Sequence, residues 1–286
     1  MLCGTNPNER LVMSSAVTSY SKAVQCSRRP VLVVTLVVLL VSALTPGPSQ
    51  AEDNPALPGF RADASDARAI EIADEVMQAL GGRQAWDNTR YVSWRFFDRR
   101  NHWWDKWTGD VRIESEDRLI LMNINTQEGR VWIDGVAATD SLLEQGLETG
   151  YAWWVNDAYW VFMPWKLKDS GVALKYLGER NMTDGAAADV LQLTFDAVGL
   201  TPSNKYDVYV DKHSRLVMEW SYYTTAADEE PQFTMPWADW SKHGSLMMVG
   251  DHGRDKDWKM ATHKTLPRSV FESTDAVDIA PPSGNP

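Results

Sequence analysis

The chain has 286 residues, with 28 Lys plus Arg against 39 Asp plus Glu, 44% hydrophobic residues and 23% charged residues. This composition is that of an ordinary globular protein, which excludes a wholly disordered chain and a collagen-like or coiled-coil design. The net charge of −11 argues against a nucleic-acid ligand, because phosphate recognition needs a basic face. We therefore expect a neutral, apolar or cationic partner.

The N-terminal segment has the pattern of an export signal. Arg28 and Arg29 precede an apolar run over residues 31–44, and residues 49–51 have the small-x-small spacing that favours cleavage. A signal peptide over 1–51 is therefore expected, with a twin-arginine signal as a variant of it. A signal anchor is the alternative, but a spanning helix needs about 18–20 apolar residues, more than this run supplies.

Cleavage after residue 51 would change the charge and the chemistry of the chain. It would leave 235 residues with 24 basic and 38 acidic side chains, a net charge of −14. Cys3 and Cys26 both lie in the removed part, so disulfides, thiolate nucleophiles and Cys-bound metals are not expected in the exported protein. A chain of this length can fold on its hydrophobic core alone, and we expect a soluble monomer without a cofactor.

The first half of the exported chain predicts one helix and then a β-meander. Residues 52–65 are rich in Pro and are expected to form a flexible leader. Residues 66–80 repeat apolar side chains at helical spacing and end at a Gly pair, which predicts a helix. Short alternating runs separated by charged turns then predict antiparallel strands at residues 89–97, 102–107, 110–115, 118–126 and 129–135. In the first strand Val92, Trp94 and Phe96 share one face, which we expect to be buried.

The middle of the chain predicts two helices, over residues 141–150 and 152–162, and Pro164 ends the second. The second helix is apolar almost all round, so we expect it to be buried. Further strands are expected at residues 171–179, 189–196, 205–211 and 215–223, and a final group at 233–240, 245–249 and 262–271. These elements predict a single β-rich domain over 66–272, followed by a disordered tail over 273–286.

This order of elements resembles the LolA/LolB-like family of outer-membrane lipoprotein carriers. Residues 156–167 are similar to the N-D-x-Y-W-x-x-M-P-x-K-L signature of uncharacterised members, and the Gly pair with Trp86 and the hairpin strand at 206–211 agree with it. The resemblance covers residues 66–272. It implies a periplasmic protein of a Gram-negative bacterium with a mainly β (α+β) fold, in which a single curved antiparallel sheet forms a half-open β-barrel. Helices would cover its concave face, which would hold acyl chains.

Large aromatic side chains on the strands and on the middle helix are candidates to line a cavity for an apolar chain. Burial of an acyl chain gains about 0.8 kcal/mol per CH₂ group, and stiff aromatic rings can shape the space for it. The alternative is that these rings fill an ordinary core. We expect the segment over 153–165 to act as a lid, and Asn156 and Asp157 to accept hydrogen bonds from buried indoles. The candidate residues are Trp94, Phe96, Trp104, Trp153, Trp154, Trp160, Phe162, Trp165, Met218 and Trp220.

Two further functions are open at this point. Acids near tryptophans, at Asp105, Asp110, Glu114 and Asp239, allow an envelope protein that binds or cleaves glycans, because glycosidases use paired carboxylates. An envelope sensor or assembly factor with the same fold is the other alternative.

Other chemistry is not expected. The acidic loop over 251–257 lacks EF-hand spacing, so it predicts a charged hairpin rather than a calcium site. The signatures of serine hydrolases, P-loop proteins, zinc proteases and haem attachment are absent from the sequence. The sequence favours a non-enzymatic carrier that binds a lipid or an acylated protein and transiently contacts a membrane or a membrane-bound acceptor.

Overall fold

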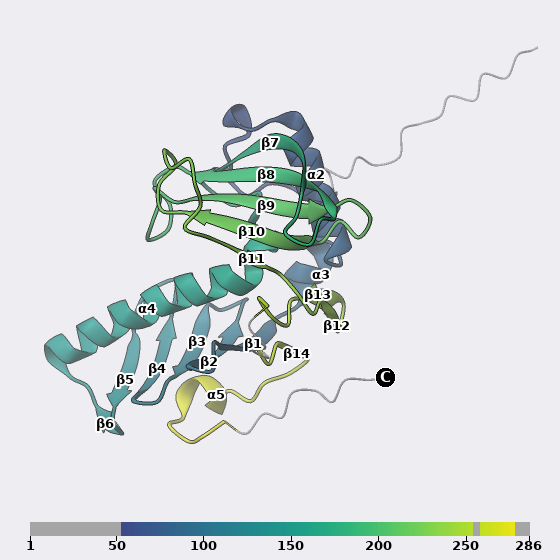
Figure 1. Ribbon diagram of the computed structural model, residues 1–286. Coiled ribbons are helices and arrows are strands. Elements are labelled where there is room, and N and C mark those ends of the chain that lie inside the picture. Colours follow the sequence, from purple (N-terminus) through teal and green to yellow (C-terminus); the bar gives the residue numbers. More distant parts are fainter. Residues whose placement is uncertain (1–52, 254–257, 278–286) are drawn as a thin grey trace, which may run out of the picture. The chain divides into compact units, whose positions relative to one another are not determined.

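The computed structural model of the chain describes residues 53–253 and 258–277 (Figure 1). The expected signal peptide over 1–51, part of the acidic loop and residues 278–286 lie outside the described residues. Within the described part, no helix is long and apolar enough to cross a membrane.

The first sheet contains seven antiparallel strands in the order β14-β1-β2-β3-β4-β5-β6. The strands are β1 (Tyr91–Phe96), β2 (Arg100–Asp105), β3 (Asp110–Glu114), β4 (Arg118–Asn123), β5 (Gly129–Ile133), β6 (Val136–Ala137) and β14 (Ala261–His263). The expected meander is confirmed from β1 to β5. Val92, Trp94 and Phe96 are buried while the residues between them are only partly covered, as the period of two predicts.

The second sheet contains five antiparallel strands in the order β11-β10-β9-β8-β7. The strands are β7 (Val172–Asn181), β8 (Ala187–Phe195), β9 (Lys205–Asp211), β10 (Val217–Tyr223) and β11 (Phe233–Pro236). A separate hairpin pairs β12 (Ser241–His243) with β13 (Leu246–Met248). The expected strands at 189–196, 205–211 and 215–223 are therefore confirmed to within two residues.

The fold is mainly β with antiparallel sheets and a few helices, as the sequence predicts. The prediction of one continuous sheet is wrong, because the described strands form separate sheets that do not close into a barrel. The hydrogen-bonded ladder stops at β6, and the chain then forms α4 (Asp140–Phe162) and the 3-10 helix η2 (Met163–Lys166) before β7 begins. An insertion of this length lets the second meander start a new ladder.

The remaining helices are η1 (Ala62–Ala64), α2 (Ala67–Ala79), α3 (Arg83–Asn88) and α5 (Ser269–Glu272). The predicted first helix is confirmed as α2. The middle segment is one helix, α4, instead of the two that were expected. The strand expected over 262–271 is also wrong, since only β14 is extended and Pro267 stands before the short helix α5.

The first half of α4 lies on the first sheet because two glycines allow close contact. A Cβ atom on Gly146 would lie 2.8 Å from a Val131 methyl, and one on Gly150 would lie 2.9 Å from Ile120. Leu143 and other apolar residues of the helix pack against the buried residues of β3, β4 and β5. These two glycines thus let α4 run close across the first sheet.

Both ends of the described chain are attached to the fold. In the expected leader, Leu57 donates its N–H to the Lys168 carbonyl at 3.0 Å, and the buried Asn54 donates to Asp74 at 2.7 Å. In the expected tail, the buried guanidinium of Arg112 on β3 donates to carbonyls on and after α5 at 2.7–3.1 Å. Hydrogen bonds therefore join residues 53–65 and 273–277 to the rest of the described fold.

Replacement of Gly146 by Ala should destabilise the protein by about 1–3 kcal/mol, because the new methyl group overpacks the contact with Val131. Urea denaturation of the single variants and of the double variant Gly146→Ala/Val131→Ala would measure the coupling between the two sites. We expect the double variant to be less destabilised than the two single changes combined. Simple additivity would contradict the close contact.

Candidate functional site

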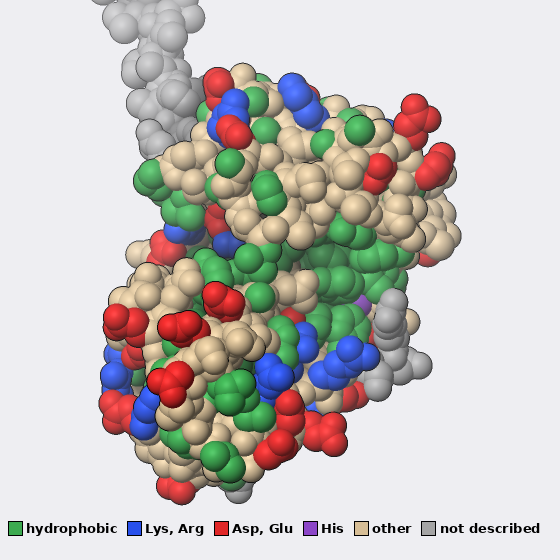
Figure 2. All heavy atoms as spheres, turned by 90° about the vertical axis from the view of Figure 1, so that its left-hand side faces the viewer, with side chains coloured by type: hydrophobic (Ala, Val, Ile, Leu, Met, Phe, Trp, Pro, Cys, Tyr) green, Lys and Arg blue, Asp and Glu red, His purple; other side chains and the backbone are tan. Residues whose placement is uncertain are grey.

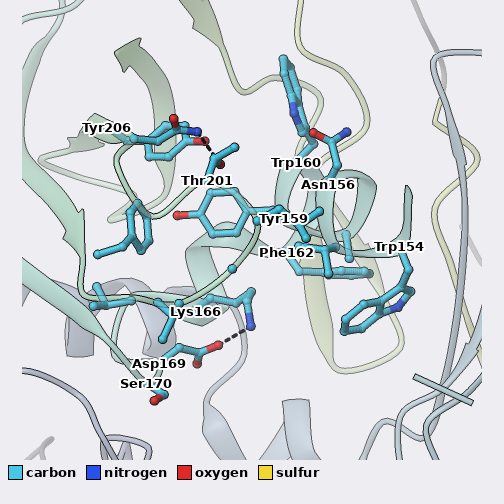
Figure 3. A pocket seen from close by; sticks show the side chains of 18 of the residues that line it. Trp154, Asn156, Tyr159, Trp160, Phe162, Lys166, Asp169, Ser170, Thr201 and Tyr206 are labelled. Atoms are coloured by element: carbon cyan, nitrogen blue, oxygen red, sulfur yellow. Dashed lines mark hydrogen bonds and ion pairs between the residues drawn. The ribbon is translucent and has the colours of Figure 1, made fainter. Parts of the chain in front are cut away.

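The second half of α4 and one face of the second sheet enclose an apolar cavity of about 640 Å³. Strands β8 to β11 and the loop over 196–204 line one side, and α4 lines the other (Figure 3). Figure 2 shows hydrophobic side chains gathered in a hollow on the face that it presents. The volume is in the range of pockets that hold small organic ligands, which are about 300–1,000 Å³.

Aromatic rings form the wall on the side of the second sheet. Tyr206 stacks on Trp220 with 4.9 Å between ring centroids, and Trp160 of α4 meets Trp220 edge-on at 5.1 Å. Tyr222 lies opposite Tyr206 in the β9–β10 pair, and Phe233 of β11 stacks 6.0 Å from Trp160. Rigid rings of this size do not collapse into the space between them, so the cavity stays open.

A second group of rings, from α3, β2 and the end of α4, lines another part of the cavity. The ring of Trp86 lies 5.3 Å from that of Phe162 and 6.5 Å from that of Trp104. The Lys106 Nζ atom lies 3.5 Å from the centroid of the Trp86 ring and donates to the carbonyls of Trp86 and Thr89. Burial lowers the pKa of Lys106 to about 7. This contact fixes the orientation of Trp86.

A buried carboxylate attaches the second half of α4 to the first sheet. Asp157 is 0% exposed and accepts two hydrogen bonds from the Arg100 guanidinium, at 2.6 and 2.8 Å. It also accepts from His102 Nε2 at 2.8 Å and from the Asn156 side-chain amide at 2.9 Å. Burial by itself would raise the pKa of Asp157, but the bonds from His102 and Arg100 outweigh it and the pKa lies below its usual value. Asp157 is therefore a buried anion held in place by β2.

The same contact determines the protonation of His102. Its Nε2 must carry a proton, since the Asp157 carboxylate can only accept, while its buried Nδ1 has no hydrogen-bond partner among the described residues. A second proton on Nδ1 would create a buried, unpaired N–H group. Burial accordingly lowers the pKa of His102 below its usual 6.5, against the opposing effect of Asp157. The imidazole is neutral and stacks on Trp94 at 4.5 Å.

Half of the residues predicted to bind the ligand line this cavity. They are Trp104, Trp154, Trp160, Phe162 and Trp220.

Three other predicted residues lie in the core behind the cavity wall. Trp94, Phe96 and Trp165 are at most 6% exposed and do not line the cavity. Trp165 stacks on Trp86 at 5.1 Å, and Phe96 packs edge-on against Trp258 at 5.7 Å. These three residues are therefore ordinary core residues and not part of the cavity wall.

Trp153 and Met218 lie elsewhere. Trp153 borders a charged hollow on the surface, where its ring contacts the Arg100 guanidinium at 4.8 Å. Met218 lies at a β-bulge, marked by a shift of register between Val217 and Glu219 in the β9–β10 pair. The bulge breaks the alternation of side chains, so Met218 does not line the cavity although Trp220 does.

The expectation that Asn156 and Asp157 accept hydrogen bonds from indoles is wrong. The oxygens of Asp157 accept hydrogen bonds from Arg100 and His102 instead. The charged guanidinium of Arg100 is a stronger donor to a carboxylate than a neutral indole N–H. Several buried indole nitrogens have no hydrogen-bond partner in the part of the chain that the structure describes. They belong to Trp94, Trp104, Trp154, Trp165, Trp220, Trp237 and Trp258.

Several aromatic residues of the cavity were not expected from the sequence. They are Trp86, Tyr159, Phe195, Tyr206, Tyr222 and Phe233. Tyr222 could have been predicted from the sequence, because it is two residues from Trp220 on one strand and therefore shares its face. The neighbours on β8, β9 and β11 could not be placed without the strand register.

The acids considered for glycan chemistry do not line the cavity. Asp105, Asp110 and Glu114 are each bound by an arginine, and Asp239 lies on the surface. Among the described residues, no group of three or more His, Cys, Asp or Glu side chains is placed to hold a metal ion. Residues 254–257 of the acidic loop lie outside the described residues.

Comparison with known proteins gives only remote likenesses. No family model and no curated protein matches the chain. Among solved structures, a DUF1329 family protein from Desulfovibrio piger is similar, with a TM-score of 0.38 and 14% sequence identity over 72% of this chain and 96% of that one. A likeness at this level carries no argument about fold or function.

Replacement of Asp157 by Asn should cost about 3 kcal/mol of unfolding free energy, because it leaves the charge of Arg100 without its buried partner. Urea denaturation measures this loss. Asp63→Asn is the matched control, since that carboxyl is 78% exposed and its replacement should change stability by less than about 0.5 kcal/mol. Equal stabilities of the two variants would contradict the anchoring role.

The free energy of unfolding should fall as the pH is lowered through 6.5. At lower pH the imidazole of His102 binds a proton in the unfolded chain, whereas its lowered pKa keeps it neutral in the folded chain. Between pH 7 and 5.5 this group should remove about 1 kcal/mol. His102→Gln can still donate to Asp157 but does not titrate, so its unfolding free energy should depend less on pH. The remaining dependence would include His263, whose pKa burial also lowers. An unchanged pH dependence in the variant would refute the assignment.

Proposed function

We propose that this protein binds an apolar ligand, a lipid or the acyl chain of a lipoprotein, and carries it without chemical change. The observation that carries the proposal is the cavity of about 640 Å³ between α4 and the second sheet. Its walls are mostly aromatic and aliphatic, so a buried hydrocarbon chain would gain about 0.8 kcal/mol for each CH₂ group removed from water.

The setting of this carrier follows from the sequence pattern. We propose that the protein is exported to the periplasm and that its curved sheets and helices form a variant of the half-open barrel of the LolA/LolB-like carriers. In an aqueous compartment a carrier must shield its ligand and release it at a membrane or a membrane-bound acceptor. The acidic surface of such a protein would limit its binding to anionic membranes to short encounters.

Placement of the aromatic rings supports this proposal over the glycan alternative. A glycan platform needs tryptophans that are flat on the surface, whereas the rings around the cavity face one another. Trp107 is the tryptophan with a largely exposed side chain among the described residues, at 61%, and it lies apart from the cavity. No observation favours the sensor or assembly role.

The loop over 196–204 is a better candidate for the segment that opens the cavity than the lid expected over 153–165. The latter segment lies inside α4 and η2 and is fixed by the buried Asp157. In the loop, Leu200 lines the cavity and is nevertheless 51% exposed. We propose that this loop moves to admit the ligand while α4 stays in place.

Titration with the uncharged fluorescent probe N-phenyl-1-naphthylamine tests the proposal. The protein should bind one probe molecule with enhanced fluorescence, and an acylated ligand should displace it. Native mass spectrometry of protein purified from an envelope fraction would then identify a bound mass. Absence of probe binding, together with a ligand-free mass after addition of lipid, would contradict a carrier.

Trp160→Ala should weaken probe binding at least about tenfold, because this ring projects from α4 and packs against Trp220 and Phe233 of the opposite wall. Trp107→Ala is the control, since it removes an exposed tryptophan away from the cavity. If Trp160→Ala unfolds the protein, Leu200→Asp on the exposed loop provides a second variant, and it should weaken binding by a similar factor. Unchanged affinity in the folded variants would exclude this cavity as the site.

A further inference from the structure

The size of the cavity favours a ligand with one hydrocarbon chain, and this step rests on the proposed function. The volume of about 640 Å³ is in the range of pockets that hold one drug-sized molecule, about 300–1,000 Å³. A single acyl chain with a small head is of that size, whereas a phospholipid with two such chains is larger.

Polar side chains interrupt the apolar lining. Lys166 and Asp169 follow α4, and Thr201 and Asn204 lie in the loop before β9. In Figure 3 the hydroxyl of Tyr159 points to the side of the cavity between Thr201 and Lys166. A ligand with a hydrocarbon chain among the aromatic rings would place its head here.

The charges in this polar part are balanced. Lys166 and Asp169 are the charged residues in the lining, and they form an ion pair with each other. A ligand carboxylate beside this partly exposed pair would lose part of its hydration without gaining an unpaired cation, and it would lie near the Asp169 carboxylate. Burial of an uncompensated charge is costly, so the site disfavours a free fatty acid in its ionised form.

The Tyr159 hydroxyl is a donor that the protein itself does not use. No hydrogen bond joins it to any residue that the structure describes, and its ring is held between Tyr206 at 5.5 Å and Phe195 at 6.1 Å. Burial raises its pKa well above 10, with a further contribution from Tyr206 and Asp169, so the hydroxyl keeps its proton. A ligand oxygen is the partner that this donor lacks.

We propose that the cavity binds a single-chain acyl compound with an uncharged polar head, such as a fatty alcohol or a monoacyl ester, whose oxygen accepts a hydrogen bond from Tyr159. The chain lies among the aromatic rings of α4 and the second sheet. The ion pair between Lys166 and Asp169 excludes anionic heads by leaving no free cation in the site.

Displacement of N-phenyl-1-naphthylamine by four ligands tests this proposal on the complete exported chain. The ligands are 1-monohexadecanoylglycerol, hexadecanoate, hexadecane and dihexadecanoylphosphatidylcholine. We expect the monoacylglycerol to bind at least about tenfold more tightly than hexadecanoate at pH 8 and more tightly than the two-chain lipid. Hexadecanoate or the two-chain lipid binding as tightly as the monoacylglycerol would overturn the proposal.

Tyr159→Phe removes the donor and keeps the ring. The preference for monohexadecanoylglycerol over hexadecane should fall about fivefold, as expected for one hydrogen bond. Tyr209→Phe is the matched control, because Tyr209 lies on β9 outside the cavity lining. An equal preference in the two variants would show that Tyr159 does not bind the head.

Asp169→Asn should reverse the selectivity for charge. Without the carboxylate, Lys166 becomes an unpaired cation in the cavity, so the affinity for hexadecanoate relative to the monoacylglycerol should rise at least about fivefold. An unchanged ratio would contradict the role of the ion pair. If no ligand displaces the probe, the proposed function itself fails; if all four bind without selectivity, the carrier stands and this inference fails.

Discussion

The site depends on the burial of one carboxylate, that of Asp157, against β2. The second half of α4 is apolar almost all round, so hydrophobic burial alone does not choose which side of the helix faces the sheet. Three hydrogen bonds to Asp157 from Arg100 and His102 of β2 choose it, because a buried anion is tolerated only where such donors are. With the helix rotation fixed, Tyr159 and neighbouring residues line the cavity.

Glycines and aromatic rings have complementary effects along α4. In its first half, Gly146 and Gly150 bring the helix close to the first sheet, and no space remains between them. In its second half, the rings of Tyr159 and Trp160 lie between the helix and Trp220 of the second sheet. Because rigid rings pack edge to face and cannot fill every gap, the same helix forms a tight contact at one end and a cavity at the other.

Much of the local structure could be predicted from the sequence. Helix α2 and strands β1 to β5 and β8 to β10 follow from hydrophobic periodicity, which depends on neighbouring residues only. Half of the residues expected to bind the ligand line the cavity, because large aromatic residues in strands pack inward whether they meet a cavity or a core. Trp94 and Trp104 look equivalent in the sequence, yet one stacks on His102 and the other lines the cavity.

The sequence by itself determined that the protein is mainly β, with antiparallel strands and an apolar helix in the middle, since these properties follow from the spacing of side chains along the chain. Only the tertiary structure decided that there are separate sheets, that a bulge turns Met218 away from the cavity, and that Tyr206 and Tyr222 meet across two strands. The physical reason is that strand register and helix rotation are set by contacts between distant segments. The partner of Asp157, for example, is Arg100, 57 residues away.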